Sequence, residues 1–290
     1  MTLRFSTLIS FALCANTLLV SVPSHSSLVH KSISACARAL HTPTSTSPAE
    51  FPVPLRLRSW NIMKFDLPGA QLELQRISRG AHLVLLQESL RGAGKDLSAE
   101  TYRYFSPGYA RGSEATGVEI RSQTPADVVC ELTFIEPWLR TPKAVSVLRL
   151  PFREGALLLI NLHAINFTLT AADYKKHLAA LSTLVFSHRG PVIVAGDFNH
   201  WNAWRASALQ TWAQELALVE VEFELDWRSR HLGSSVDTIF LRGLRAVARA
   251  AFPTTRSDHN AIAASLVLLK RPSDQEGGNL AEGVSLTPMH

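Results

Sequence analysis

The segment that most constrains the fold is a short apolar run that ends in a carboxylate and an amide. Residues 192–195 are small or β-branched, and Gly196-Asp197-Phe198-Asn199 follow directly. The run predicts a buried strand, and the glycine frees the backbone at its end. Residues two apart in extended chain share a face, so Asp197 and Asn199 are expected side by side. Such a pair suits a hard cation, a bound water or an anionic oxygen; an Asx turn is the structural alternative.

Apolar or alternating runs predict further strands, and helical spacing predicts helices between them. The expected strands are 55–61, 81–86, 117–122, 127–135, 144–150, 156–162, 236–241 and 261–269, and the expected helices are 69–79, 170–187 and 203–216. Residues 91–115 are expected to be rich in loops. This irregular alternation favours two packed sheets with helices outside over a doubly wound parallel sheet.

Polar side chains stand at or near the ends of several of these strands. They are Asn61, Glu88, His163, Asp197 with Asn199, Asp237, and Asp258 with His259. Each alone has an ordinary explanation, because a glutamate past a strand can face solvent and a histidine can be a hydrogen-bonded core residue. Their recurrence in this order indicates a single site at the strand ends.

Six ordered motifs make the chain resemble the endonuclease/exonuclease/phosphatase superfamily, in an exported bacterial form. The motifs are Trp60-Asn61-Ile62, Gln87-Glu88, Asn161-Leu162-His163, Gly196-Asp197-Phe198-Asn199, Val236-Asp237-Thr238-Ile239-Phe240 and Ser257-Asp258-His259. The resemblance covers residues 55–269. It implies the DNase-I-like fold, an α/β (α+β) four-layer sandwich of two packed mixed β-sheets flanked by helices. It also implies divalent-metal-dependent cleavage of phosphoester bonds.

For the metal, the resemblance implies Glu88 as principal ligand, with Asn61 and Asp258 close by. Oxygen ligands suit Mg²⁺ or Mn²⁺, and no cluster of cysteine and histidine argues for zinc. Some family members carry a second acidic residue two positions after the asparagine. Here Met63 stands there, so we expect one metal ion.

For catalysis, the resemblance implies a pair in which Asp237 orients His259. His259 would then take a proton from the attacking water or contact the phosphate. Asp197 and Asn199 would position that water and the phosphoryl oxygens. His163 would lie on the leaving-group side, as a phosphate contact or a general acid.

Further positions stay open. The candidates to orient His163 are Glu119 and Glu114, between which the sequence does not choose. Asn166 is a candidate phosphate contact, and Trp201 and Trp204 are candidates to stack on a base, although tryptophans there more often pack in a core.

The amino-terminal segment predicts export. A basic start, an apolar run over 5–22 and small polar residues resemble a secretory signal over residues 1–26, with an uncleaved membrane anchor as the alternative. Residues 27–53 read as a flexible linker rich in Ser, Thr and Pro, 54–270 as the catalytic domain and 271–290 as a disordered tail. We therefore expect a secreted or periplasmic protein, or one anchored facing the periplasm. Cys36 and Cys130 could pair there, which the sequence leaves open.

Composition limits the function only loosely. A hydrophobic fraction of 46% predicts a sizeable core, and a net charge of +5 suits anionic partners without selecting nucleic acid. The leading expectation is a phosphodiesterase or nuclease that uses a metal- and His-activated water. The alternatives are a phosphomonoesterase or phospholipase-type hydrolase of sugar, inositol or lipid phosphates, and a non-catalytic binding protein on the same scaffold. No long basic insertion is present to grip a duplex. We expect a monomer without a stable protein partner.

Overall fold

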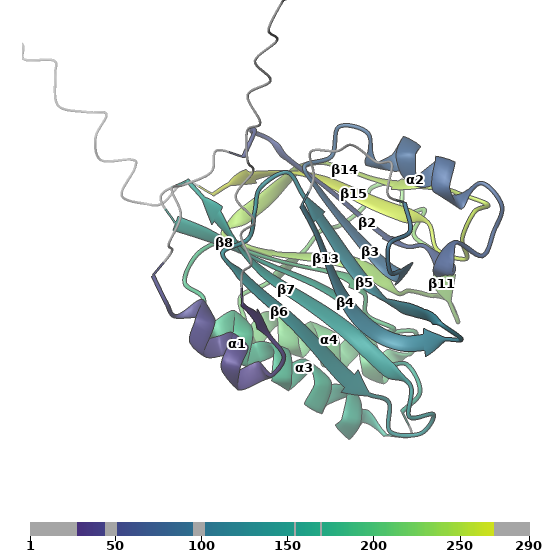
Figure 1. The fold of residues 1–290 in the computed structure, drawn as a ribbon, viewed down its shortest axis with the longest axis horizontal. Coiled ribbons are helices and arrows are strands. Elements are labelled where there is room, and N and C mark those ends of the chain that lie inside the picture. Colours follow the sequence, from purple (N-terminus) through teal and green to yellow (C-terminus); the bar gives the residue numbers. More distant parts are fainter. Residues whose placement is uncertain (1–27, 44–50, 95–101, 154, 169, 270–290) are drawn as a thin grey trace, which may run out of the picture.

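The computed structural model describes residues 28–43, 51–94, 102–153, 155–168 and 170–269. Two large sheets lie face to face, and helices cover both outer faces (Figure 1). The seven-stranded sheet contains, in spatial order, β1 (Val29–His30), β6 (Val128–Ile135), β7 (Pro142–Phe152), β8 (Gly155–His163), β9 (Val192–Asp197), β13 (Asp237–Arg242) and β10 (Val219–Glu220). The six-stranded sheet contains β14 (Leu244–Phe252), β15 (Ala261–Leu268), β2 (Leu55–Asn61), β3 (Leu83–Leu90), β5 (Glu114–Ser122) and β4 (Tyr102–Arg111).

Both sheets are mixed. The pairs β1–β6, β8–β9 and β2–β3 are parallel, whereas neighbours such as β7–β8 and β9–β13 are antiparallel. The helices are α1 (Ile33–Leu40), α2 (Ala70–Ser78), α3 (Ala171–Phe186) and α4 (Ala203–Glu215), with a 3₁₀ turn η1 at Met63–Phe65. A two-stranded ribbon with two residues in each strand, β11 (Arg230–His231) with β12 (Ser234–Ser235), forms a separate small sheet.

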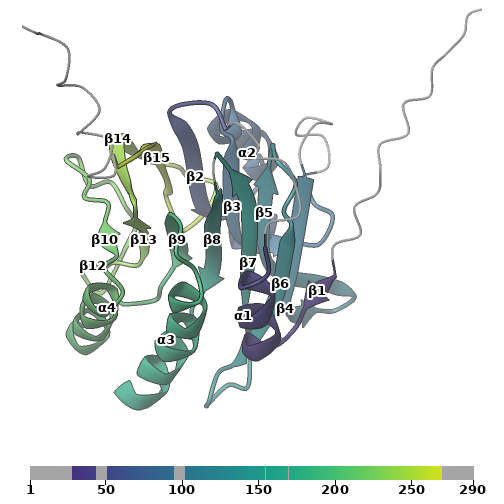
Figure 2. The ribbon, with the colours of Figure 1, turned by 90° about the vertical axis from the view of Figure 1, so that its left-hand side faces the viewer.

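Three apolar cores separate the four layers. Between the sheets, Leu57 and Leu85 of one pack near Leu159 and Ile193 of the other. Alternate residues of the seven-stranded sheet face α1, α3 and α4, which gather on its outer side (Figure 2). Helix α2 covers the six-stranded sheet through Leu74 and Ile77. The expected four-layer architecture is therefore confirmed, and burial of both sheet faces explains the long apolar strands.

One expectation about local structure is wrong, and one strand had not been predicted. Residues 102–111, expected within a loop-rich segment, form β4, which pairs with β5 in spite of a register shift between Pro107 and Ala110. The chain also turns at Gly243 into β14, which had not been expected as a strand.

The linker expected over residues 27–53 does not hold for residues 28–43. Val29 and His30 pair with β6, and α1 buries Cys36, Ala37, Ala39 and Leu40 in the core. The Ser32 side chain caps α1 by accepting the amide N–H of Ala35 at 3.3 Å. A disulfide joins Cys36 to Cys130 of β6, which answers the question that the sequence leaves open.

The expected signal or anchor over residues 1–26 and the expected tail over 271–290 lie outside the described residues. Within the described residues, no helix combines the length and the apolar character needed to cross a membrane.

Candidate active site

Three adjacent strands of the seven-stranded sheet carry a row of polar side chains at one edge of the sheet, where β8 and β9 end and β13 begins. The register pairs His163 of β8 with Asp197 of β9, and Asp197 with Asp237 of β13. Gly196 makes the close approach of β8 and β9 possible, because a Cβ there would lie 2.1 Å from the Leu162 carbonyl oxygen. The order of the strands, which the sequence did not show, thus places these three residues together.

The six-stranded sheet contributes from the opposite side. Asn61 ends β2, and its Nδ2 donates to Asp197 Oδ2 of the other sheet at 3.1 Å. Glu88 lies where the β3–β5 register shifts between Leu86 and Ser89, with a left-handed φ of 51°. Such a bulge re-aims a side chain, and here it turns Glu88 to a shared cavity.

Two buried amides join the sheets directly behind these residues. Gln87 Nε2 donates to Asn161 Oδ1 at 2.7 Å, and Asn161 Nδ2 donates to the carbonyl oxygens of Leu86 and Glu119, both at 3.0 Å. The first residues of the Gln87-Glu88 and Asn161-Leu162-His163 motifs therefore hold the sheets together, while the last residues face the cavity.

His259 and Asp237 form a buried hydrogen-bonded pair. The His259 Nδ1 to Asp237 Oδ2 distance is 2.6 Å, and His259 Nε2 lies 3.9 Å from Asp197 Oδ2. The backbone of the 257–259 segment is fixed as well, because Trp60 Nε1 donates to the His259 carbonyl at 2.8 Å and Ser257 Oγ donates to the Asn61 carbonyl at 2.7 Å.

Asp197 and Asn199 do not lie side by side as extended residues. Asn199 has a φ of 50°, its N–H donates to Asp197 Oδ1 at 3.0 Å, and its Nδ2 donates to the Ala164 carbonyl at 3.1 Å. This is the Asx turn that was the structural alternative. Both residues still line the cavity.

The cavity between the two sheet ends measures about 370 Å³. It brings together all the predicted site residues except Asp237, which lies behind His259; those that line it are Asn61, Glu88, His163, Asp197, Asn199, Asp258 and His259. Asn166 and Trp201 also line it, and Trp201 Nε1 donates to Asn166 Oδ1 at 2.7 Å. Trp204 lies elsewhere, in a groove between α3 and α4.

Burial and mutual charge shift the pKa values of this cluster. Burial alone would lower the pKa of His259, but the charge and hydrogen bond of Asp237, with Asp197 and Asp258 nearby, raise it to about 10. Burial raises the pKa of Asp197, and the charge of Asp237 adds to this. Burial and the positive charge of Lys143 hold the pKa of His163 well below its usual range. The site thus contains one histidine stabilised as a cation and one stabilised as a neutral base.

Three cations that sequence reasoning missed hold this arrangement. Lys64 forms a direct ion pair with Glu88, and Lys143 Nζ lies 2.8 Å from His163 Nε2. Glu119, one of the two residues expected to orient His163, instead accepts from Arg121 at 2.6 Å and Arg103 at 2.8 Å.

Arg205 is the third cation, and it is fully buried. It donates to the carbonyls of Ile165, Asn166 and Asn199, and to Thr168 Oγ1. It therefore ties the segments that follow β8 and β9, which form one wall of the cavity.

The donor set suits a hard divalent cation. Glu88, Asn61 and Asp258 line one cavity and offer oxygen atoms, and Mg²⁺ typically takes one or two carboxylates and keeps several waters. Among the described residues, no group of three or more His, Cys, Asp or Glu side chains converges as a ready metal centre. A cation held there would depend on these few ligands together with water and substrate oxygens.

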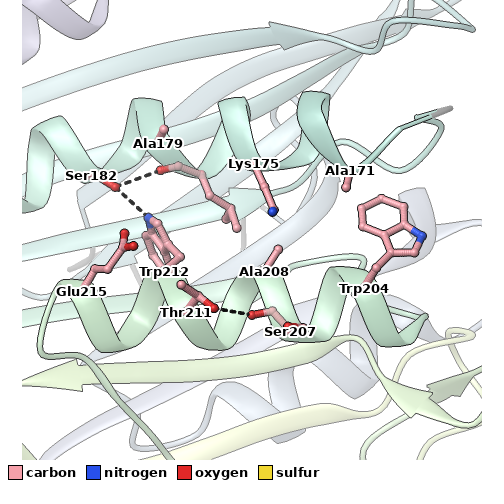
Figure 3. A pocket seen from close by; sticks show the side chains of 11 residues that line it. Ala171, Lys175, Ala179, Ser182, Trp204, Ser207, Ala208, Thr211, Trp212 and Glu215 are labelled. Carbon is pink, nitrogen blue, oxygen red and sulfur yellow. Dashed lines mark hydrogen bonds between the residues drawn. The ribbon is translucent and has the colours of Figure 1, made fainter.

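A second hollow of about 410 Å³ lies on the outer surface between α3 and α4. Its walls are small side chains such as Ala179, Ser207 and Ala208, with Trp204 near one end and Glu215 near the other (Figure 3). One hydrogen bond joins the two helices there, from Trp212 Nε1 of α4 to Ser182 Oγ of α3 at 3.0 Å.

Comparison with known proteins agrees with this geometry. A model of the "Endonuclease/Exonuclease/phosphatase family" matches residues 59–259. A UPF0294 protein of Yersinia pseudotuberculosis is 37% identical over 217 residues, which covers 71% of this chain and 81% of that protein.

Two solved structures are similar in fold. The catalytic domain of human Nocturnin, solved with a bound sulfate anion, has a TM-score of 0.60 at 14% identity and covers 79% of this chain and 100% of that one. Sphingomyelinase C from Streptomyces griseocarneus has a TM-score of 0.53 at 16% identity and covers 74% of this chain and 99% of that one. At these identities the likeness concerns the fold alone.

Proposed function

The chain belongs to the endonuclease/exonuclease/phosphatase family, and from this premise we propose that it is a divalent-metal-dependent phosphodiesterase or nuclease. The observation that carries the proposal is the Asp237–His259 pair, 2.6 Å apart, at a cavity whose opposite wall carries Glu88 and Asn61. Hydrolysis of a phosphoester needs an oriented water, a proton acceptor and neutralised phosphoryl oxygens.

The chain's own residues supply these parts. Asp237 holds His259 by Nδ1 and stabilises its charged form, so Nε2, which faces Asp197 across the site, can donate a hydrogen bond to a phosphoryl oxygen. Asp197, whose pKa burial raises, can accept the proton of the water. Asp197 is fixed by Asn61 and by the amide of Asn199, so its carboxylate orients the water without reorganisation.

Glu88, Asn61 and Asp258 would hold Mg²⁺ or Mn²⁺. When bound, such an ion neutralises charge on the phosphoryl oxygens and lowers the pKa of a bound water.

A second candidate is a hydrolase of phosphomonoesters or lipid phosphates with the same site. The observation that favours it is an apolar mouth: Phe167 and Leu232 line the cavity and are 44% and 84% exposed. An acyl chain would cover this surface, whereas a small sugar phosphate would not, so within this candidate the lipid phosphates are favoured.

For location we propose an oxidising compartment outside the cytoplasm. The Cys36–Cys130 disulfide supports this, because such bonds persist in secreted and periplasmic proteins. N-terminal sequencing of the protein from its host should show that the predicted signal has been removed. Recovery of intact Met1 in a soluble cytosolic fraction would contradict export.

The decisive test is hydrolysis by purified protein of single- and double-stranded DNA, RNA, phospholipid vesicles and small phosphomonoesters. EDTA should abolish turnover, and Mg²⁺ or Mn²⁺ should restore it; full activity after exhaustive chelation would refute metal dependence.

Glu88→Ala should abolish turnover or raise the metal requirement sharply. Glu215→Ala removes an exposed glutamate in the helix groove and is the matched control.

A further inference from the structure

Lys143 is a buried lysine in the cavity wall that no sequence motif includes. It stands near the start of β7, is 8% exposed and lines the cavity. Its Nζ lies 2.8 Å from His163 Nε2 and 3.9 Å from Glu136 Oε1. A lysine is rarely buried unless its charge has a partner, so this position needs an explanation.

The contact with His163 fixes the direction of a hydrogen bond. In its charged form, Lys143 has three N–H donors and no acceptor, so His163 Nε2 accepts from it. The same Nε2 lies 3.5 Å from Asp197 Oδ2 and 3.9 Å from Glu88 Oε1. The nitrogen that faces the site therefore carries no proton, and it cannot donate to a leaving oxygen as the expected role of general acid requires.

The charge of Lys143 is only loosely matched. Glu136 Oε1 already accepts the amide N–H groups of Asn166 at 2.6 Å and Phe167 at 3.3 Å, and its 3.9 Å distance to Lys143 exceeds a hydrogen bond. A neutral imidazole does not cancel an ammonium charge. Lys64 differs, because its charge is spent in a direct ion pair with Glu88.

We propose that Lys143 contacts the phosphoryl group of the substrate, and that His163 is a positioning residue that holds the ammonium in place. The ammonium has N–H donors beyond the one that His163 accepts, and a phosphoryl oxygen is the acceptor that the proposed reaction brings to this wall. A fixed cation at that point stabilises the negative charge that develops on the phosphoryl oxygens. The inference deepens the proposed phosphoester hydrolysis and rests on it.

The first test measures binding rather than turnover. Inorganic phosphate is titrated into the protein by calorimetry in the presence of Mg²⁺, for the wild type, Lys143→Met, Lys143→Arg and Lys175→Met. Lys143→Met should weaken phosphate binding by roughly tenfold or more, since hydrogen bonds to charged groups are the strong ones. Lys143→Arg should retain most of the affinity, and Lys175→Met, an exposed lysine of the helix groove, should bind as the wild type does.

The second test uses a chromogenic phosphodiester such as bis(p-nitrophenyl) phosphate. Lys143→Ala should lose on the order of 10²-fold in kcat, and added ethylammonium should restore part of that loss. A merely structural lysine would not be rescued by a free amine.

The outcomes separate the two proposals. Unchanged phosphate affinity in Lys143→Met, or failure of the wild type to bind phosphate, would overturn the role of Lys143. Phosphate binding that depends on Lys143 in a protein that cleaves no phosphoester would support that role and refute the proposed function. Thermal unfolding of each variant checks its fold, and phosphate binding by Lys143→Ala takes the place of the methionine variant if that variant does not fold.

Discussion

The cavity at the strand ends and the groove between α3 and α4 have similar volumes, about 370 and 410 Å³, but their walls are built differently. In the cavity, side chains from both sheets fix one another, as when Asn61 holds Asp197 and Asp237 holds His259. In the groove, most side chains project separately along two helices (Figure 3). A catalytic site is therefore better identified by polar side chains that several elements hold in place than by empty volume.

The largest effect is expected from the pair in the cavity. Asp237→Asn and His259→Ala should each lower kcat by on the order of 10²-fold or more, the usual loss when one fixed donor to a developing negative charge is removed. The double variant should lose little beyond the worse single one, because the two residues act as a unit. Steady-state kinetics on one phosphodiester measures this, with Glu215→Ala as the groove control. Independent, multiplicative losses would show that Asp237 does not act through His259.

The helix layer should affect stability and leave chemistry intact. Replacing both Cys36 and Cys130 by serine should cost about 2–5 kcal/mol of unfolding free energy, the usual range for a native disulfide in a secreted domain. Urea unfolding measures the loss, and kcat at 25 °C should stay near the wild-type value. A large fall in kcat without a change in stability would mean that α1 supports the cavity directly.

His177 of α3 offers a contrast with His259. It lies edge-on to Phe134 with ring centroids 4.3 Å apart, and burial lowers its pKa to about 3, helped by the charge of Arg205. An unfolded histidine titrates near 6.5, so the unfolded chain binds more protons below that pH, and stability is lost as the pH falls. Between pH 6.5 and 5 this amounts to roughly 2 kcal/mol.

His177→Phe should remove that part of the acid sensitivity. Urea midpoints at pH 7 and pH 5 for the wild type and the variant measure it, with exposed His41→Phe as control. The prediction is wrong if wild type and His177→Phe lose the same stability on acidification.

The smallest effect is expected in the groove itself. Ser207→Ala and Thr211→Val alter exposed residues and should change stability by less than about 0.5 kcal/mol. Turnover should be unchanged within error. A clear fall in activity would show that the groove takes part in function, and the contrast between the two hollows would no longer hold.

Strands and helices could be predicted from the sequence where the local pattern of apolar and polar residues was strong. The strands β2, β8, β9 and β13 were predictable because each is an apolar or alternating run. Strand β4 was not, because its arginines, serine, proline and glycine resemble a loop, and pairing with β5 decides its conformation. Helix α1 was missed because its eight residues lie within Ser- and Pro-rich surroundings and depend on packing against the core.

Within the site, motif residues were predictable and their supporting cations were not. Asp237 and His259 belong to recognisable sequence motifs. Lys143 and Arg205 do not, and the residues next to them in the sequence do not predict what they contact. Arg205 binds acceptors between Ile165 and Asn199, and Lys143 reaches His163 across β7 and β8. Such contacts follow from which strands become neighbours. The prediction that Asn199 is extended was wrong for another reason. The Asp197 carboxylate accepts the amide N–H of Asn199, and this turn ends the extended backbone.

The amide bridge between Gln87 and Asn161 has a mechanical consequence. Hydrogen bonds are directional and resist sliding, whereas the apolar contacts that fill the rest of the intersheet layer tolerate small displacements. Any shear between the two sheets should therefore pivot about the site, with the largest amplitude at the opposite end of the strands. Glu88 of one sheet and Asp197 of the other would then keep their separation while the two sheets are displaced slightly elsewhere.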